Sequence, residues 1–130
     1  MTGIILLTND GDLSYKLSHP RFQIEKKYIV HTVNDVDDDK LQKFKTGFDI
    51  NNQKYKAEIR KIKKCNGYYV WNVILTDGKN REIKKIFKFL EASLLLLHRY
   101  SFAGLLLDNL KEGDSRLLSD NETNMLHNIK

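Results

Sequence analysis

The sequence predicts an α+β fold in which helices pack on a mixed, mostly antiparallel sheet. Strand-like and helix-like patterns alternate along the chain without an internal repeat. An Asn-Gly pair joins two strand-like stretches, and a later segment has the apolar stripe of a surface helix. At 130 residues and 15.2 kDa the chain is long enough for one compact core, so we expect residues 1–130 to form a single domain.

The hydrophobic pattern and the turn residues place the individual elements. In chain order we expect strand 3–8, helix 11–18, strand 24–33, helix 37–46, strands 54–62 and 68–75, helix 81–90, strands 94–97 and 105–107, and a short helix from residue 121. Asp10 is placed to cap the first helix, and Pro20 follows its end because proline cannot continue a helix. The second helix begins with acidic residues, which suit the positive end of its dipole, and Gly47 follows its last turn.

The later strands are marked by turn chemistry and by composition. Asn66-Gly67 is typical of a tight hairpin turn, so strands 54–62 and 68–75 are expected to pair antiparallel. The second of these strands is aromatic and β-branched, as strands often are. We expect the final strand pair to be interrupted at residues 98–100 and 103–104, and the chain beyond to be polar up to its last helix.

Basic residues outnumber acidic residues and are segregated from them. The chain has 22 Lys and Arg against 17 Asp and Glu, with a formal net charge of +5 and a pI of about 9.2. Four acids lie within residues 35–39, whereas lysines and arginines gather at residues 61–64 and 79–88. This distribution fits either a polyanionic partner such as nucleic acid or a solvated basic surface.

The predicted helix 81–90 is apolar on one side and basic on another. Its apolar residues are Ile83, Ile86, Phe87 and Leu90, and its cations are Arg81, Lys84, Lys85 and Lys88. The cations fit a stripe that follows a phosphate backbone, with the start of the helix aimed at a site. A lysine-rich face that only contacts solvent is the simpler alternative.

Several classes of function are excluded by the residues. The longest apolar run, residues 94–97, is far shorter than the roughly 20 residues that span a bilayer. The single Cys65 cannot form an internal disulfide, and neither it nor the spacing of the four histidines indicates a metal site. The chain has no glycine-rich phosphate loop or dinucleotide fingerprint, and no secretory signal, so we expect a cytoplasmic protein by elimination.

Five motifs stand in a definite order along nearly the whole chain. They are the leucine-rich stretch and Asn-Asp-Gly turn of residues 3–11, Pro20-Arg21 with Glu-Lys-Lys-Tyr-Ile-Val at 25–30, Gly-Lys-Asn-Arg-Glu-Ile-Lys-Lys-Ile-Phe at 78–87, Leu-His-Arg-Tyr-Ser-Phe-Ala at 97–103, and Leu110, Gly113, Arg116 and Leu118. In this order they resemble the catalytic domain of ribosomal small-subunit and large-subunit pseudouridine synthases, with alanine replacing that family's glycine at position 103.

The resemblance implies an enzyme that isomerises uridine to pseudouridine in RNA without a cofactor or metal. Ribosomal RNA is the expected substrate. Tyr28 matches the tyrosine that packs against the flipped base, Lys84 matches the basic residue that pairs with the catalytic aspartate, and Leu97 matches an apolar residue of the pocket. These residue types suit the chemistry, because a base that leaves its stack needs an aromatic face and apolar walls. A cation beside a carboxylate also keeps that carboxylate ionised.

Further RNA-binding candidates are the arginines and lysines of the matched motifs, namely Arg21, Arg81, Lys85, Lys88 and Arg99. Arginine holds a phosphate with two donors, which favours Arg81 and Arg99 as phosphate ligands. Two assignments have simpler alternatives: Tyr28 as a half-buried strand tyrosine, and Lys84 as a solvated lysine whose neighbours carry the RNA contact.

The family's catalytic aspartate has no counterpart in this sequence. By the family spacing it stands five residues before the glycine matched by Gly3, ahead of Met1. The resemblance therefore implies an incomplete catalytic domain, without the opening strands or the small N-terminal RNA-binding domain, that is inactive alone. An unpaired sheet edge would favour dimerisation or association with an N-terminal piece.

Three accounts fit this departure. The chain is the C-terminal part of a longer enzyme, a non-catalytic RNA-binding remnant, or one half of a split enzyme. RNA is the expected partner in all three, and no membrane is expected. An interaction module with a basic helix and no RNA partner is the remaining alternative.

Overall fold

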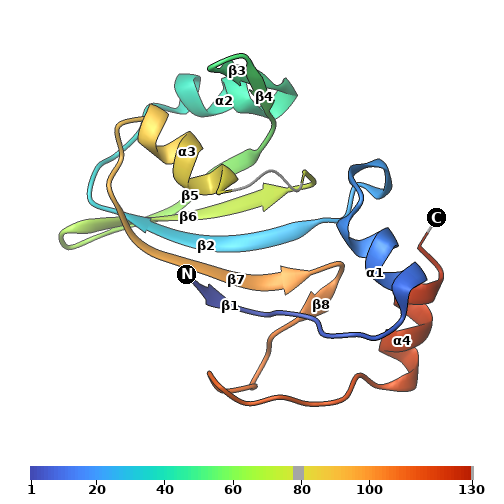
Figure 1. The fold of residues 1–130 in the computed structure, drawn as a ribbon. Helices are drawn as coiled ribbons and strands as arrows, with labels where there is room; N and C mark the ends of the chain where they lie inside the picture. The colour runs from blue at the N-terminus through green and yellow to red at the C-terminus, as the bar shows by residue number, and fades with distance from the viewer. Residues whose placement is uncertain (78–80, 130) are drawn as a thin grey trace.

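A mixed sheet lies at the centre of the structure, a computed structural model that describes residues 1–77 and 81–129 (Figure 1). In chain order the elements are β1 (Thr2–Gly3), α1 (Gly11–Ser18), a 3-10 helix (Pro20–Phe22), β2 (Lys26–Thr32), α2 (Asp38–Thr46), β3 (Phe48–Ile50), β4 (Gln53–Tyr55), β5 (Glu58–Cys65), β6 (Tyr68–Leu75), α3 (Glu82–Phe89), β7 (Leu94–Phe102), β8 (Leu105–Leu106) and α4 (Asp120–His127). Gly78, Lys79 and Asn80 of the third matched motif lie outside the described residues.

The main sheet has the strand order β1-β7-β2-β6-β5, with β8 paired to β7. β1 runs parallel to β7, whereas the other neighbouring strands are antiparallel. β3 and β4 form a separate two-stranded sheet. The predicted α+β fold with a mixed, mostly antiparallel sheet is confirmed.

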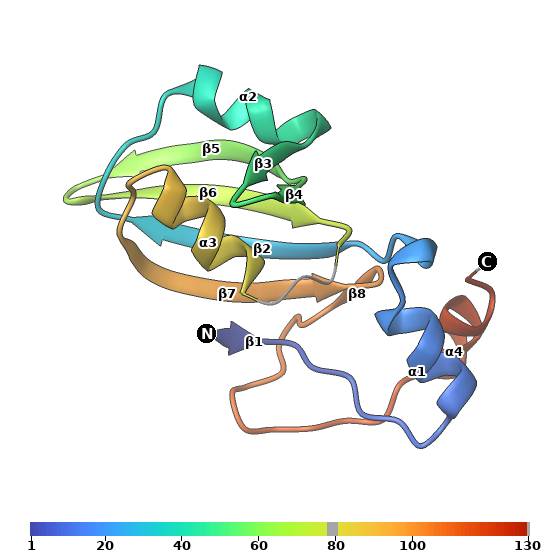
Figure 2. The ribbon, with the colours of Figure 1, turned by 45° about the horizontal axis from the view of Figure 1, so that its top comes forward.

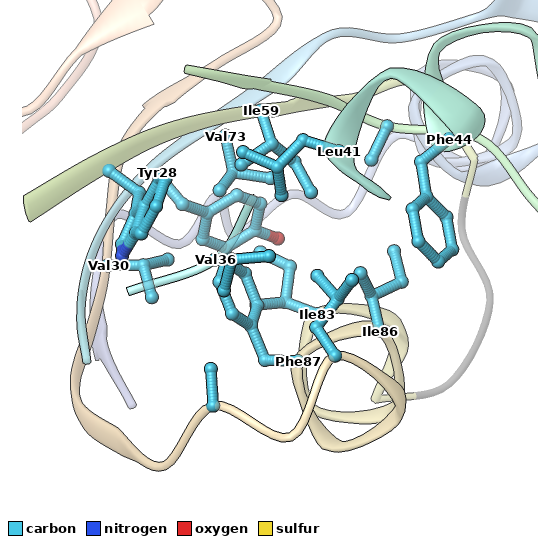
Figure 3. Close-up of a cluster of buried hydrophobic side chains, with 14 of the residues drawn as sticks. Tyr28, Val30, Val36, Leu41, Phe44, Ile59, Val73, Ile83, Ile86 and Phe87 are labelled. Carbon is cyan, nitrogen blue, oxygen red and sulfur yellow. The ribbon is translucent and has the colours of Figure 1, made fainter. Parts of the chain in front are cut away.

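Helices α2 and α3 cover the same face of this sheet (Figure 2). The core between them contains Val30, Trp71 and Phe87, each fully buried, and Figure 3 shows Ile83, Ile86 and Phe87 of α3 directed toward strand residues. The indole N–H of Trp71 donates to the buried Thr32 hydroxyl at 2.8 Å, so this polar group in the core has a partner.

A second, smaller core lies where α1 packs against α4 (Figure 1). Its buried residues are Leu13, Leu17, Ile24, Leu105 and Leu126. A capping box begins α4, because the Ser119 hydroxyl accepts from the Glu122 backbone N–H while the Glu122 carboxylate accepts from the Ser119 N–H. Arg116 of the last matched motif donates to both carboxylate oxygens of Glu122 at 2.8 Å, which ties the preceding loop to this helix.

Most helix and hairpin predictions are confirmed. Asp10 caps α1 by accepting from two backbone N–H groups, and Pro20 opens the 3-10 helix that follows α1. The Asn66-Gly67 pair joins β5 to β6 as expected. The predicted strand 54–62 is instead divided between β4 and β5, and the sequence pattern missed the short β3.

Two strand predictions were wrong. The expected buried strand 3–8 is reduced to β1, because β7 is the partner of only two residues, and Ile5 and Leu7 are 71% and 87% exposed. Ile4 and Leu6 alternate with them and pack against the α1–α4 core. The expected interruption at residues 98–100 is absent, because β7 pairs with β2 through these residues and the shift in their register is taken up by a β-bulge.

In the part of the chain that the structure describes, no helix has the length and apolar character to cross a bilayer.

The close approach of β1 to β7 depends on glycine at position 3. Its φ of +128° is rarely adopted by other residues, and an added Cβ would collide with the backbone of Arg99. We expect Gly3→Ala to lower the free energy of unfolding by about 1–3 kcal/mol, measured by urea denaturation. Gly11→Ala is the matched control because a Cβ there meets nothing within 4 Å. Equal stability of the two variants would contradict this constraint.

The Arg116–Glu122 pair predicts acid sensitivity of α4. Arg116 and the Ser119 N–H lower the pKa of Glu122 from 4.5 to about 2. A lowered folded pKa means that the pair stabilises the fold above pH 4.5 and that this contribution is lost as the pH falls toward 2. The stability difference between wild type and Glu122→Gln, measured by thermal unfolding, should therefore shrink over this range. Glu112→Gln, at an exposed carboxyl, controls for general charge effects.

Candidate active site

A cavity of about 340 Å³ lies between the main sheet and the first turn of α3. Five residues predicted from the sequence line it: Tyr28, Arg81, Lys84, Leu97 and Arg99. They come from β2, from the start of α3 and from β7, which are well separated in the chain. Met1 also lines the cavity, so the N-terminal segment forms part of its wall.

Strand register explains why the sheet residues meet. Tyr28 lies opposite Val73 of β6 on one side and opposite Arg99 of β7 on the other. The β2–β7 register shifts just before Tyr28, and such bulges change the direction of nearby side chains. Tyr28 is only 7% exposed, which fits a ring at the floor of a cavity as well as the simpler interpretation of a core tyrosine.

The helix residues lie at the rim because α3 is strongly amphipathic. Ile83 is buried against the sheet, while Arg81 and Lys84 are exposed and still line the cavity. Arg81 precedes the helix with a φ of +51°, a conformation that non-glycine residues seldom adopt. The predicted division of this helix into an apolar and a basic side is confirmed.

Lys26 is a site residue that the sequence analysis did not select. Its ammonium group donates to the backbone carbonyl of Asp77 at 3.1 Å and lies 5.9 Å from the Phe102 ring. Burial, and next the positive charge of Arg99, lower the pKa of Lys26. A usable signal was present, because residues two apart in a strand share a face, and Lys26 stands two residues before Tyr28.

Arg99 also holds the N-terminal segment in place. Its Nε and Nη2 atoms donate to the Ile4 carbonyl at 2.9 and 2.7 Å, and the Ile4 N–H donates to the Arg99 carbonyl at 2.9 Å. The guanidinium lies 4.9 Å from the Phe102 ring centre. These contacts keep β1 and Met1 beside the cavity, and phosphate binding by Arg99 stays a prediction.

The structure does not bring three other candidates into this cavity. Arg21 is exposed on the 3-10 helix, where its guanidinium lies 4.8 Å from the Phe22 ring centre. Lys85 is exposed on α3 outside the cavity, and Lys88 lines a separate hollow further along that helix. RNA contact by these three residues stays a prediction from the sequence.

The cavity combines apolar walls with charges of both signs. Leu75, Ile83 and Leu97 provide apolar surface around Tyr28, and four cations, Lys26, Arg81, Lys84 and Arg99, lie among the lining residues. Asp77 and Glu82 contribute carboxyl groups. Its volume falls in the range of about 300–1,000 Å³ typical of small-ligand sites. Within residues 1–77 and 81–129, no three His, Cys, Asp or Glu side chains gather to hold a metal ion.

Comparison with known proteins decides the family. Residues 1–89 match the family model described as RNA pseudouridylate synthase. The chain belongs to the RNA pseudouridylate synthase family. Tyr28, Arg81, Lys84, Lys85 and Lys88 fall within the part of the chain that the family model covers. Leu97 and Arg99 come later and reach the cavity through β7.

The relatives of this family member extend the match to nearly the whole chain. An uncharacterized RNA pseudouridine synthase of Borreliella burgdorferi is 34% identical over 96% of the chain and 49% of the relative. Ribosomal large subunit pseudouridine synthase B of Buchnera aphidicola is 34% identical over 98% of the chain and 51% of the relative. Ribosomal small subunit pseudouridine synthase A of Haemophilus influenzae is 29% identical, over 96% of the chain and 54% of that protein.

A solved pseudouridylate synthase structure has the same fold. It superposes with a TM-score of 0.85 and 26% sequence identity, and the match covers 95% of this chain and 54% of that structure. The chain therefore spans about half the length of the curated relatives and of the solved synthase that it matches.

Lys26→Met tests the balance of forces on the buried ammonium. We expect the free energy of unfolding to change by less than about 1 kcal/mol, because losing one hydrogen bond is offset by removing a half-buried charge beside Arg99. Since the folded pKa of Lys26 is lowered, wild type should gain stability relative to this variant as the pH rises toward 10.5. Lys27→Met, on the opposite face of β2, is the control for urea denaturation. A decrease in the free energy of unfolding well above about 1 kcal/mol would contradict this balance and show that the fold needs the Lys26 ammonium group.

Proposed function

We propose that this chain forms the base-binding and RNA-binding part of a pseudouridine synthase that acts on ribosomal RNA. The observation that carries the proposal is the cavity in which Tyr28, Leu97 and Lys84, the three residues matched to family site positions, line one space. The ribosomal RNA class is supported by the names of relatives from Buchnera aphidicola and Haemophilus influenzae. The cytoplasmic location stays a prediction from the sequence.

In the proposed site, a uridine leaves its RNA stack and enters the cavity. Tyr28 contacts the face of the base, and Leu75 and Leu97 exclude water from its edges. Arg81 is exposed at the rim, where its guanidinium can hold the phosphate of the flipped nucleotide with two donors. These groups bind and orient the nucleotide while the glycosidic bond breaks, the base rotates and the bond to carbon 5 forms.

Lys84 is the residue proposed to pair with the catalytic aspartate. A lysine at the cavity rim would keep that carboxylate ionised at neutral pH. Met1 lines the same cavity. In the family pattern the aspartate stands three residues before the position of Met1, which supports a place for it beside Lys84. No residue of the chain matches it, so we expect the isolated chain to bind RNA without turnover.

The alternative functions use the same site. A non-catalytic remnant would bind RNA through Arg81 and Lys84 and never receive an aspartate. One half of a split enzyme would receive it from a separate polypeptide. All of these accounts share the RNA-binding surface. Turnover after an aspartate is supplied, and not RNA affinity, therefore separates the non-catalytic remnant from the two catalytic accounts.

A chimera tests whether this site is catalytically competent. The part of the Borreliella burgdorferi relative that precedes the matched segment, fused ahead of Met1, is chosen to supply the aspartate that the family pattern places there. We expect this chimera to release tritium from RNA carrying 5-tritiated uridine, whereas the isolated chain stays at the level of a no-protein control. Lys84→Ala in the chimera should lower the rate at least about tenfold, since a charge interaction of a few kcal/mol with the aspartate is lost.

Two controls make the result decisive. Lys111→Ala removes an exposed lysine from the C-terminal loop and should leave the rate unchanged. Lys84→Arg keeps the charge and should retain most of the activity. A folded chimera that binds RNA but releases no tritium would favour the RNA-binding remnant, and tritium release by the isolated chain would overturn the expected need for an external aspartate.

A further inference from the structure

A second hollow lies beside α3 and the turn that follows it. Its volume is about 510 Å³, and its lining residues are Lys84, Lys88, Glu91, Ala92, Ser93 and Leu94. These residues belong to α3, the turn after it and the start of β7, which follow one another in Figure 2. The hollow is therefore formed by a continuous stretch of chain next to the candidate active site.

Lys84 connects this hollow to the active-site cavity. The same side chain lines both spaces, with the hollow on the C-terminal side and the cavity on the N-terminal side of its turn of helix. A strand whose base occupies the cavity would therefore meet the hollow as it continues past Lys84.

The two lysines of the hollow are spaced for consecutive contacts. Lys84 and Lys88 are four residues apart, so they lie on the same side of α3 with Cβ atoms about 5–6 Å apart. Both are exposed and can reach a phosphate in solvent. Lys85 is equally exposed, but it points about 100° away from Lys84 and about 60° away from Lys88 around the helix, and it lines neither space. Position on the helix thus separates lysines that the sequence alone treats alike.

Two hydrogen bonds fix the turn that lines the hollow. The Ala92 N–H donates to the Phe87 carbonyl at 3.0 Å, and the Ser93 N–H donates to the Asn34 side-chain oxygen at 3.0 Å. Glu91, with a φ of +59°, makes the turn between α3 and β7. Its carboxyl group makes one wall negative, so an anionic group would bind on the side of the two lysines.

We propose that this hollow binds the nucleotide next to the target uridine in the same RNA strand, with its phosphate between Lys84 and Lys88. The inference rests on the proposed function and adds the direction of the strand, from the cavity along α3 toward Glu91. Phosphate is the matching chemistry because two exposed lysines line one open space.

The test compares Lys88→Ala with wild type for binding of single-stranded oligouridylate over a range of salt concentrations. We expect about three- to tenfold weaker binding, and a salt slope reduced by about 0.7 for one lost phosphate contact to a single strand. Lys88→Arg should restore both quantities because it keeps the charge. Circular dichroism melts confirm that each variant is folded.

Matched lysine variants decide whether position matters. Lys85→Ala, at a lysine on the same helix that lines neither space, should weaken binding less than Lys88→Ala and change the salt slope less. Lys111→Ala in the C-terminal loop should leave binding unchanged. Equal effects of Lys85→Ala and Lys88→Ala would overturn the proposed path and indicate a diffuse basic surface.

Uridine monophosphate separates this inference from the proposed function. The mononucleotide fills only the cavity, so its binding, followed by NMR shifts of cavity residues, should be unaffected by Lys88→Ala. Intact mononucleotide binding with no effect of Lys88→Ala on oligouridylate would refute the hollow and leave the proposed function in place. Failure of wild type to bind either probe would contradict both.

Discussion

The packing of α3 on the main sheet is the interaction on which the rest of the structure depends. Ile83, Ile86 and Phe87 are almost completely buried against β2, β5 and β6, which contributes on the order of 1.5–3 kcal/mol for each side chain. Once this apolar side is packed on the sheet, the residue spacing of the helix also sets the direction in which the basic side points. Lys84 and Lys88 therefore border two neighbouring spaces, and hydrophobic packing sets the position of the charges.

A second constraint acts at the opposite wall of the cavity. Gly3 allows β1 to approach the Arg99 backbone closely, and the Arg99 guanidinium then binds the Ile4 carbonyl. One arginine thus belongs to the cavity wall and to the attachment of the N-terminal segment. Mutating Arg99 would disturb both roles, so loss of RNA binding in such a variant would not by itself identify a phosphate ligand.

Local patterns predicted elements well where one side of the element is buried and the other is solvated. The amphipathic α3, the capped α1 and the Asn66-Gly67 hairpin were all predicted for this reason. The pattern failed at residues 3–8, where only Gly3 pairs with a strand and the apolar run beyond it packs in alternation against a small core. It also failed at β7, where polar residues continue a strand. Whether such a segment forms a strand depends on a partner strand that is distant in the sequence, and the local hydrophobic pattern carries no information about that partner.

The sequence by itself determined the family motifs, the α+β class and the residue types of the site, because these follow from local spacing and composition. Only the tertiary structure decided which of those residues meet. The antiparallel pairing of β2 with β7 brings Tyr28 opposite Arg99, and this contact depends on strand order and register. The same holds for Lys26, which is recognised as a site residue once the cavity is formed, and for the distinction between Lys88 and Lys85. The physical reason is that a cavity is defined by neighbours across the sheet, whereas sequence patterns describe neighbours along the chain.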